Sequence, residues 1–333
     1  MNITRYGWKS LALAGVLAAL AVPASAQSPV LISMSSGVNQ VPTIVAVDQG
    51  FFKDAGLDVE LKPVGRGAIA IEALSGGSVQ FAESAHTTFF SAVNKGLPLV
   101  AVGIAARGYY GKLIASNDNG DLKTLADFKG KRIGIQVGTG MHMVVQMLLE
   151  KEGLTEDDFT ITNIRVTDMP AAMATGDTFD AVIGWEPVMQ RIVQSGNGVK
   201  VITARDFEKL AGITYPFPLS TTREYLEANP EVVQKVLDGY ARADKFITDN
   251  PEKAVDIYAK YLDTVGGGLD RETAKYMMFD TDRFGGVAFT DRDMQDLEAT
   301  RQFLLDTRDM EDLPPVKDMI VETYAEKAEA SVQ

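Results

Sequence analysis

The segment Gly138–Gly140, which reads Gly-Thr-Gly, is the motif in this sequence with the clearest chemical use. It follows a predicted strand over Arg132–Gln136 and opens a predicted helix over Met141–Glu150. Free N–H groups at a helix start attract anions, so the motif is a candidate anion cradle. A tight turn without ligand contact is the alternative. A dinucleotide site is not expected, because Met143 stands where that fingerprint needs a third glycine.

Two further polar segments follow predicted strands. Ser84–Thr87 comes after a strand over Val79–Ala82, and Trp185–Pro187 comes after a strand over Ala181–Ile183. Ligands of open α/β sheets bind beyond the carboxyl ends of strands, so both segments are candidates for ligand contact. The alternatives are structural: an N-cap role for the hydroxyls of the first segment, and domain packing with a helix-start charge for the second.

Two arginines are candidates for holding an acidic group. Arg66 follows the predicted strand over Val59–Leu61, and Arg107 follows the strand over Leu99–Ile104. A guanidinium binds a sulfonate, carboxylate or phosphate through two parallel hydrogen bonds. Most arginines are ordinary surface residues, so each also has that simpler explanation.

Metal, thiol and nucleophile chemistry are not expected. The chain has no cysteine and two histidines, His86 and His142. Two such ligands are too few for a zinc site, which usually has three or four protein ligands. No spacing identifies a nucleophile with a base and an orienting group. We expect His142 to pack beside its helix start and His86 to be a candidate for the ligand site. The sequence therefore predicts no cofactor, no metal and no enzymatic activity.

The first 26 residues are typical of a secretory signal peptide. Arg5 and Lys9 precede an apolar run over Leu11–Val22, and a small-x-small pattern ends at Ala26. The run is shorter than the roughly 20 residues that span a bilayer, so we expect cleavage after Ala26 and export. Without a cysteine for lipid attachment, the periplasm of a two-membrane bacterium is favoured. The formal net charge is −13, and loss of two basic residues makes it −15, which argues against nucleic-acid partners.

The remaining chain contains two series of short strands separated by helices, and then a helical C-terminal part. Alternation of this kind predicts mostly parallel sheets, and the length predicts two lobes. We expect lobe 1 to comprise residues 27–110 and 215–333, lobe 2 to comprise residues 111–214, and crossovers near 109–111 and 213–217. A local echo between Ala73–His86 and Met173–Glu186 predicts that the Ser84 and Trp185 segments face each other across one cleft. The C-terminal helices are expected over Glu231–Thr248, Pro251–Leu262, Arg271–Met278 and Asp291–Leu305.

A series of weak motifs resembles one protein family. The motifs are Gln49–Val59, Glu72–Phe81, Leu125–Ile135 with Gly138–Gly140, Glu152–Leu154 and Asp180–Pro187. In this order they resemble the substrate-binding proteins of nitrate-, sulfonate- and taurine-type ABC importers. The resemblance implies an α/β fold of the periplasmic type II binding-protein kind, with each lobe a mostly parallel sheet flanked by helices and a ligand cleft between the lobes.

The resemblance also implies a function. It implies a monomeric periplasmic protein that closes on a small organic anion, sulfonate- or taurine-like, and delivers it to the permease subunits of an ABC importer at the inner membrane. An aromatic acid or a pyrimidine as ligand, and a ligand-sensing role, remain open alternatives. A relative that synthesises the thiamine pyrimidine relies on a cysteine-rich segment, which this chain lacks.

The resemblance places the loop after the first strand, with Ser35, Gly37 and Asn39, in the cleft. The full set of candidate ligand-binding residues is Ser35, Gly37, Asn39, Arg66, Ser84, His86, Thr87, Arg107, Tyr110, Gly138, Thr139, Gly140, Trp185, Glu186 and Tyr215.

Overall fold

The computed structural model describes residues 1, 28–34, 37–265, 268–307, 310 and 312–333. The predicted signal peptide beyond residue 1, and Ser35, lie outside the described residues. Within the described ranges, no helix combines the length and the apolar character that crossing a membrane requires.

Five strands form the first sheet, in the order β2-β1-β3-β10-β4. Their bounds are β1 (Val30–Met34), β2 (Val59–Pro63), β3 (Phe81–Glu83), β4 (Leu99–Ala106) and β10 (Phe217–Thr222). Strand β1 pairs in parallel with β2 and β3, whereas β10 pairs antiparallel with β3 and β4. Four strands therefore run one way and β10 runs against them.

The second sheet repeats this arrangement, in the order β7-β6-β8-β5-β9. Its strands are β5 (Gly111–Ala115), β6 (Arg132–Ile135), β7 (Thr160–Asn163), β8 (Ala181–Trp185) and β9 (Val199–Ile202). Here β5 is the antiparallel strand, in the fourth place that β10 occupies in the first sheet. The prediction of mostly parallel sheets is confirmed.

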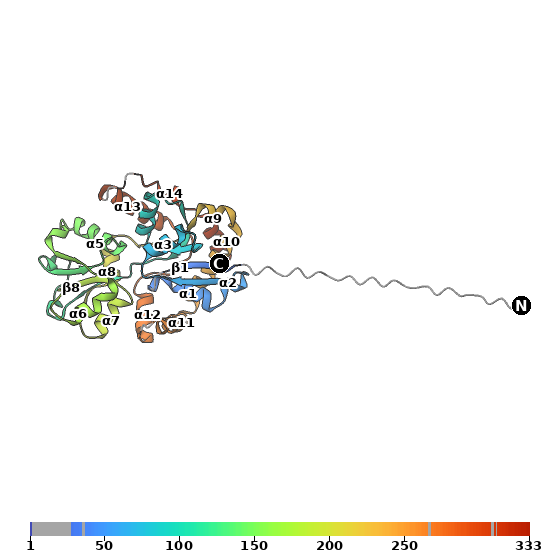
Figure 1. Ribbon diagram of the computed structural model, residues 1–333. Helices are drawn as coiled ribbons and strands as arrows, with labels where there is room; N and C mark the ends of the chain where they lie inside the picture. The colour runs from blue at the N-terminus through green and yellow to red at the C-terminus, as the bar shows by residue number, and fades with distance from the viewer. Residues whose placement is uncertain (2–27, 35–36, 266–267, 308–309, 311) are drawn as a thin grey trace.

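Helices cover both sheets, and each sheet with its helices forms a lobe (Figure 1). Helices α5 (Gly140–Lys151), α6 (Met169–Ala174), α7 (Val188–Gln194) and α8 (Ala204–Ala211) belong to the second sheet. The remaining α-helices are α1 (Val41–Asp48), α2 (Phe51–Asp54), α3 (Gly67–Ser75), α4 (His86–Asn94), α9 (Arg223–Ala228), α10 (Pro230–Asp249), α11 (Pro251–Thr264), α12 (Arg271–Phe279), α13 (Asp291–Thr307), α14 (Val316–Met319) and α15 (Thr323–Ala330). The exact lobe limits stay a prediction.

The chain passes between the sheets twice, over residues 107–110 after β4 and over residues 212–216 before β10. Beside the first crossover lies a buried ion cluster of Lys112, Glu186, Asp280 and Arg283. Lys112 Nζ is 2.5 Å from Glu186 Oε1 and 2.8 Å from Asp280 Oδ2, and Arg283 also pairs with Asp280. Arg283 Nη1 donates to the carbonyl of Tyr109 at 2.9 Å, which ties this cluster to the crossover.

Candidate functional site

A pocket of about 60 Å³, here called the cleft pocket, is lined by residues from both lobes. The first lobe supplies the start of α3, the segment after β3 and Phe217, and the second supplies the segment before α5 and Trp185. The lining residues are Arg66, Gly67, Ala68, Ser84, Ala85, Thr88, Tyr110, Gly138, Thr139, Gly140, Trp185 and Phe217. The segments at the carboxyl ends of β3, β6 and β8 therefore meet at one space, which is where open α/β sheets bind ligands.

Arg66 is the cationic residue in the lining of the cleft pocket. It stands in extended conformation directly before α3 and is exposed. No described residue forms an ion pair with its guanidinium or accepts a hydrogen bond from it. The next residue, Gly67, lets the helix start approach the other loop closely, because a Cβ there would lie 3.2 Å from Ser84 Cβ. The guanidinium therefore has its donors available beside the Ser84 segment.

The start of α5 supplies free backbone donors to the same pocket. Gly138 has φ +77°, a left-handed conformation that favours glycine, and Thr139 is the N-cap. Thr139 Oγ1 accepts from the N–H of His142 at 3.3 Å and donates to the carbonyl of Gln136 at 2.7 Å. The N–H of Gly138 donates to His142 Nδ1 at 3.3 Å. No described residue accepts from the N–H groups of Gly140 and Met141, because the first N–H groups of a helix have no acceptor inside it, so these two are available to an anion.

Gly140 is required for a different reason, namely close contact between the lobes. A Cβ at this position would lie 1.9 Å from Tyr215 Oη and 2.7 Å from Thr87 Oγ1. Both hydroxyls are buried, and neither forms a hydrogen bond of regular geometry with a described residue. Tyr215 also has φ 54°, which is strained for a bulky residue. The α5 start and the second crossover therefore fit together only without a side chain at residue 140.

Three aromatic side chains form one wall of the cleft pocket. The ring centroid of Tyr110 lies 6.1 Å from that of Trp185 and 5.2 Å from that of Phe217. Tyr110 and Trp185 are half-buried, whereas Phe217 is buried. This wall places apolar surface beside Arg66 and the start of α5 in the same lining.

The structure brings seven of the predicted residues into the lining: Arg66, Ser84, Tyr110, Gly138, Thr139, Gly140 and Trp185. Thr87 lines the neighbouring pocket described below. The lining also contains Gly67, Ala68, Thr88 and Phe217, which are outside the predicted set, and Ala85, which lies inside the predicted Ser84–Thr87 segment. Gly67 next to a candidate arginine was a usable signal, but nothing in the sequence distinguishes Ala68 from a core alanine.

Arg107 does not line the cleft pocket. Its Nε and Nη2 donate to Asp293 at 2.9 and 2.7 Å, and Nη1 and Nη2 donate to the carbonyls of Gly286 and Ala288 at 2.6 and 2.7 Å. With 8% of its surface exposed, Arg107 ties the end of β4 to the segment before α13. Its prediction as an anion-binding residue is replaced by this structural role.

His86 is also held away from the cleft pocket. Nδ1 lies 3.0 Å from the carbonyl of Pro216, and because a carbonyl only accepts, Nδ1 carries the proton. Nε2 lies 3.0 Å from Thr300 Oγ1 and accepts from it in the neutral ring. Burial lowers the pKa of His86 to about 4, against a raising contribution from the Pro216 carbonyl. The imidazole is therefore neutral near pH 7 and joins α4 to α13 and to the end of the second crossover.

The remaining candidates lie behind the lining. Asn39 is buried and its amide donates to the carbonyls of Arg107 and Gly108 at 3.3 and 3.2 Å, and Gly37 directly precedes that helical turn. Glu186 belongs to the buried ion cluster and accepts from the N–H of Gln190 at 2.9 Å, which is the helix-start role considered above. Tyr215 packs its ring 4.6 Å from that of His86, with its hydroxyl against Gly140.

Curated relatives are named as binding proteins. The chain is 29% identical over 231 residues to a "Putative binding protein" of Brucella abortus (strain 2308), covering 69% of this chain and 70% of that protein. It is 28% identical over 192 residues to a "Putative aliphatic sulfonates-binding protein" of Escherichia coli (strain K12), covering 58% of each.

Solved structures show the same fold. The alkanesulfonate-binding protein SsuA from Xanthomonas axonopodis pv. citri, solved bound to MOPS, superposes with a TM-score of 0.73 at 19% identity, covering 88% of this chain and 98% of that one.

An enzyme is also among the relatives. The 4-amino-5-hydroxymethyl-2-methylpyrimidine phosphate synthase of Aspergillus parasiticus is 25% identical over 240 residues, covering 69% of each chain. The family model described as NMT1/THI5 like matches residues 38–254, well over half of the 333 residues, so the chain belongs to that family.

Proposed function

We propose that this protein is a periplasmic solute-binding protein of an ABC importer, and that it binds a small organic anion of the sulfonate or taurine kind. The observation that carries the proposal is that Arg66, which has no ion-pair partner among the described residues, lines one pocket together with the start of α5, where the N–H of Gly140 is available. A relative named for aliphatic sulfonates supports it. A sulfonate has three acceptor oxygens, enough for the two donors of a guanidinium fork and for helix N–H groups.

Binding is proposed to proceed by closure of the lobes. Contacts to Arg66 and Ser84 come from one lobe, and contacts to Gly138–Gly140 and Trp185 come from the other. A ligand that touches both lobes stabilises the closed form by the contacts absent from the open form. The two crossovers, at residues 107–110 and 212–216, are the proposed hinge, with lobe limits at 110/111 and 214/215. The protein is proposed to act as a monomer after cleavage of residues 1–26, and to dock on the importer permease.

We propose that the cleft pocket binds its ligand without changing it. Among the described residues that line it, the ionisable side chains are Arg66 and Tyr110. Burial raises the pKa of Tyr110 well above its ordinary value, only partly offset by Arg283, so the phenol stays neutral. A general acid or base would need a pKa near the working pH, and the raised pKa of Tyr110 takes its phenol further from that range. The enzyme among the relatives is the reason to test this point directly.

An aromatic acid or a pyrimidine is the second candidate for the ligand. The wall of Tyr110, Trp185 and Phe217 is the observation that favours it, because aromatic rings stack at offset or tilted angles on such surfaces.

The test uses the protein without residues 1–26, in which Trp185 is the only tryptophan. Alkanesulfonates, taurine, aromatic acids, pyrimidines and nitrate are titrated while Trp185 fluorescence and calorimetric heat are followed. We expect saturable binding of an organic anion, with a change in fluorescence and with the ligand recovered intact. Calorimetric binding without a fluorescence change would contradict the site, and a chemically altered ligand would contradict the binding-only role. Loss of uptake in a deletion strain distinguishes import from sensing.

A further inference from the structure

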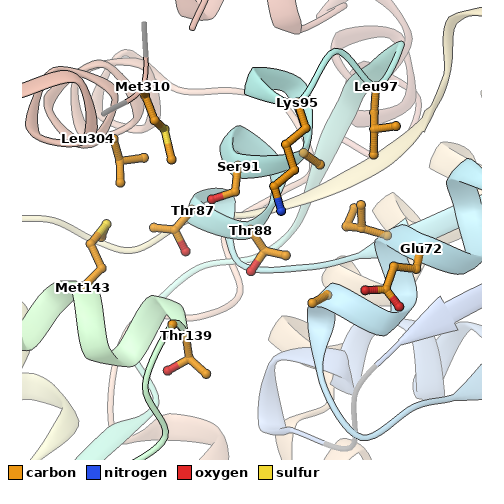
Figure 2. A pocket seen from close by; sticks show the side chains of 14 residues that line it. Glu72, Thr87, Thr88, Ser91, Lys95, Leu97, Thr139, Met143, Leu304 and Met310 are labelled. Carbon is orange, nitrogen blue, oxygen red and sulfur yellow. The ribbon is translucent and has the colours of Figure 1, made fainter. Parts of the chain in front are cut away.

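A second pocket, here called the side pocket, lies beside the cleft pocket and has a volume of about 300 Å³ (Figure 2). Helices α3 and α4, the start of α5 and the end of α13 contribute to it. Its lining residues are Ala68, Ile71, Glu72, Thr87, Thr88, Ser91, Ala92, Lys95, Leu97, Gly138, Thr139, Met143, Leu304 and Met310.

Helical spacing explains why these side chains share one space. On α3, Ala68, Ile71 and Glu72 are three and four residues apart, and therefore lie on one face. On α4, Thr87 and Ser91 are four residues apart, and Lys95 continues this row at the end of the helix. Both helices contribute side chains to the side pocket, with Glu72 of α3 on one side of the view and Met143 and Leu304 on the other (Figure 2).

The side pocket continues the cleft pocket. The two share Ala68, Thr88, Gly138 and Thr139 in their linings. A volume of about 60 Å³ holds an acidic group and little more, whereas the neighbouring 300 Å³ has room for a body of several carbon atoms. A ligand held by its acidic group at Arg66 and the α5 start can therefore extend past Thr88 without any change in the fold.

The chemistry of the side pocket is amphipathic. Ile71, Leu97, Met143 and Leu304 supply apolar surface. The polar groups of the same lining include the hydroxyls of Thr88 and Ser91, the ammonium of Lys95 and the carboxylate of Glu72 (Figure 2). Lys95 is exposed, and no described residue forms an ion pair with it. The apolar side is the larger contributor to affinity, because an exposed ammonium is well solvated and screened.

We infer that the ligand is an elongated organic anion, with its acidic group in the cleft pocket and an apolar body in the side pocket. The inference rests on the proposed function, because it needs the anion at Arg66. Burying one methylene contributes roughly 0.8 kcal/mol, which corresponds to about a threefold to fourfold gain in affinity. Affinity is therefore expected to rise by about that factor per methylene until the side pocket is filled.

The experiment is a calorimetric titration with straight-chain alkanesulfonates from two to eight carbons. In the unaltered protein without residues 1–26, we expect affinity to rise with chain length over at least four members. Ser91→Phe fills the side pocket and is expected to flatten this rise while leaving ethanesulfonate binding within about twofold. Ser91→Ala and Lys95→Gln are the controls, and both should retain the rise.

A second variant guards against misfolding of the first. Leu97→Ala removes part of the apolar wall and is expected to weaken the longest members by about tenfold, with ethanesulfonate unchanged. Binding of ethanesulfonate without any dependence on chain length, or an unaltered rise in both Ser91→Phe and Leu97→Ala, would overturn the side-pocket inference alone. Failure of every alkanesulfonate to bind would overturn the proposed anion site and this inference together.

Discussion

The cleft pocket and the buried ion cluster both contain charged side chains. The charges of the ion cluster are paired with one another, whereas the charge of the cleft pocket has no partner among the described residues. In the ion cluster, Lys112 lies between Glu186 and Asp280 and is fully buried. In the cleft pocket, Arg66 is exposed and has no ion-pair partner among the described residues. Burial alone lowers the pKa of Lys112, but the two carboxylates outweigh it and raise that pKa. The charge of Lys112 is therefore neutralised inside the fold, whereas the charge of Arg66 remains available to an anionic ligand.

The comparison extends to neighbours in the chain. Trp185 lines the cleft pocket, whereas Glu186 belongs to the ion cluster. In the first lobe, Ser84 lines the cleft pocket and Glu83 before it is buried. Glu83 is held by hydroxyls rather than by a cation, since Tyr240 Oη donates to its Oε1 at 2.5 Å and Thr43 also contacts it. Each cleft loop therefore adjoins a buried carboxyl group. Glu186 is paired with a cation, whereas Glu83 is hydrogen-bonded to hydroxyl groups.

The largest effect is expected from breaking the ion cluster. Lys112→Met leaves the Glu186 carboxylate buried without its cation, and removing one partner of a buried pair costs about 3–5 kcal/mol. We expect the free energy of unfolding in urea to fall by that amount. Lys112→Met combined with Glu186→Gln should recover part of the loss, because the uncompensated charge is then removed. An unchanged stability in Lys112→Met would show that the cluster is not a structural element.

The next effect concerns the contact between the lobes. Gly140→Ala places a methyl group 1.9 Å from Tyr215 Oη, and overpacking of this kind costs about 1–3 kcal/mol. Alanine is a better helix former than glycine, so α5 itself is not weakened. We expect affinity for the anion to fall by roughly 5- to 150-fold in calorimetry. Adding Tyr215→Phe removes the hydroxyl and should restore part of the affinity, and no recovery would contradict the contact.

A loss of affinity of similar size, without the loss of stability, is expected at Arg66. Arg66→Ala removes charged hydrogen bonds worth about 1.5–3 kcal/mol, so anion affinity should fall by roughly 10- to 150-fold. Stability should change by less than about 0.5 kcal/mol, because the side chain is exposed and has no ion-pair partner in the part of the chain that the structure describes. Lys62→Ala is the matched control, since Lys62 is an exposed cation on the neighbouring strand that pairs with Glu60. Equal affinity loss in both variants would indicate a general charge effect rather than a binding site.

The smallest effect is a pH dependence of stability at Glu83. Burial raises the pKa of Glu83 from 4.5 to about 7, against lowering hydrogen bonds from Thr43, Tyr240 and Gln40. Between these two values the folded state binds more protons than the unfolded state, so stability falls as pH rises. The contribution of Glu83 should be about 1 kcal/mol lower at pH 6.5 than at pH 5.5. Glu83→Gln should lose this slope in urea unfolding, and an identical slope in both proteins would contradict the assignment.

Much of the fold was predictable, because strands β1, β2, β4 and β6 and helices α10 to α13 carry strong local patterns. Pro230 and Pro251 begin α10 and α11, where a missing N–H costs nothing. Strands β5, β9 and β10 were not predicted, because each completes a sheet only by pairing with strands distant in sequence.

The candidate site was predictable to the level of segments. The chain alone determined that Ser84, Gly138–Gly140 and Trp185 follow strands, and therefore that their loops lie at the carboxyl ends of the sheets. Only the tertiary structure decided between Arg66 and Arg107, because the two have similar sequence surroundings. Asp293, which neutralises Arg107, is 186 residues away in the chain, and no local rule could reveal that pairing. Charge compensation is a property of the folded arrangement: it pairs Arg107 with Asp293 and leaves Arg66 without an ion-pair partner among the described residues.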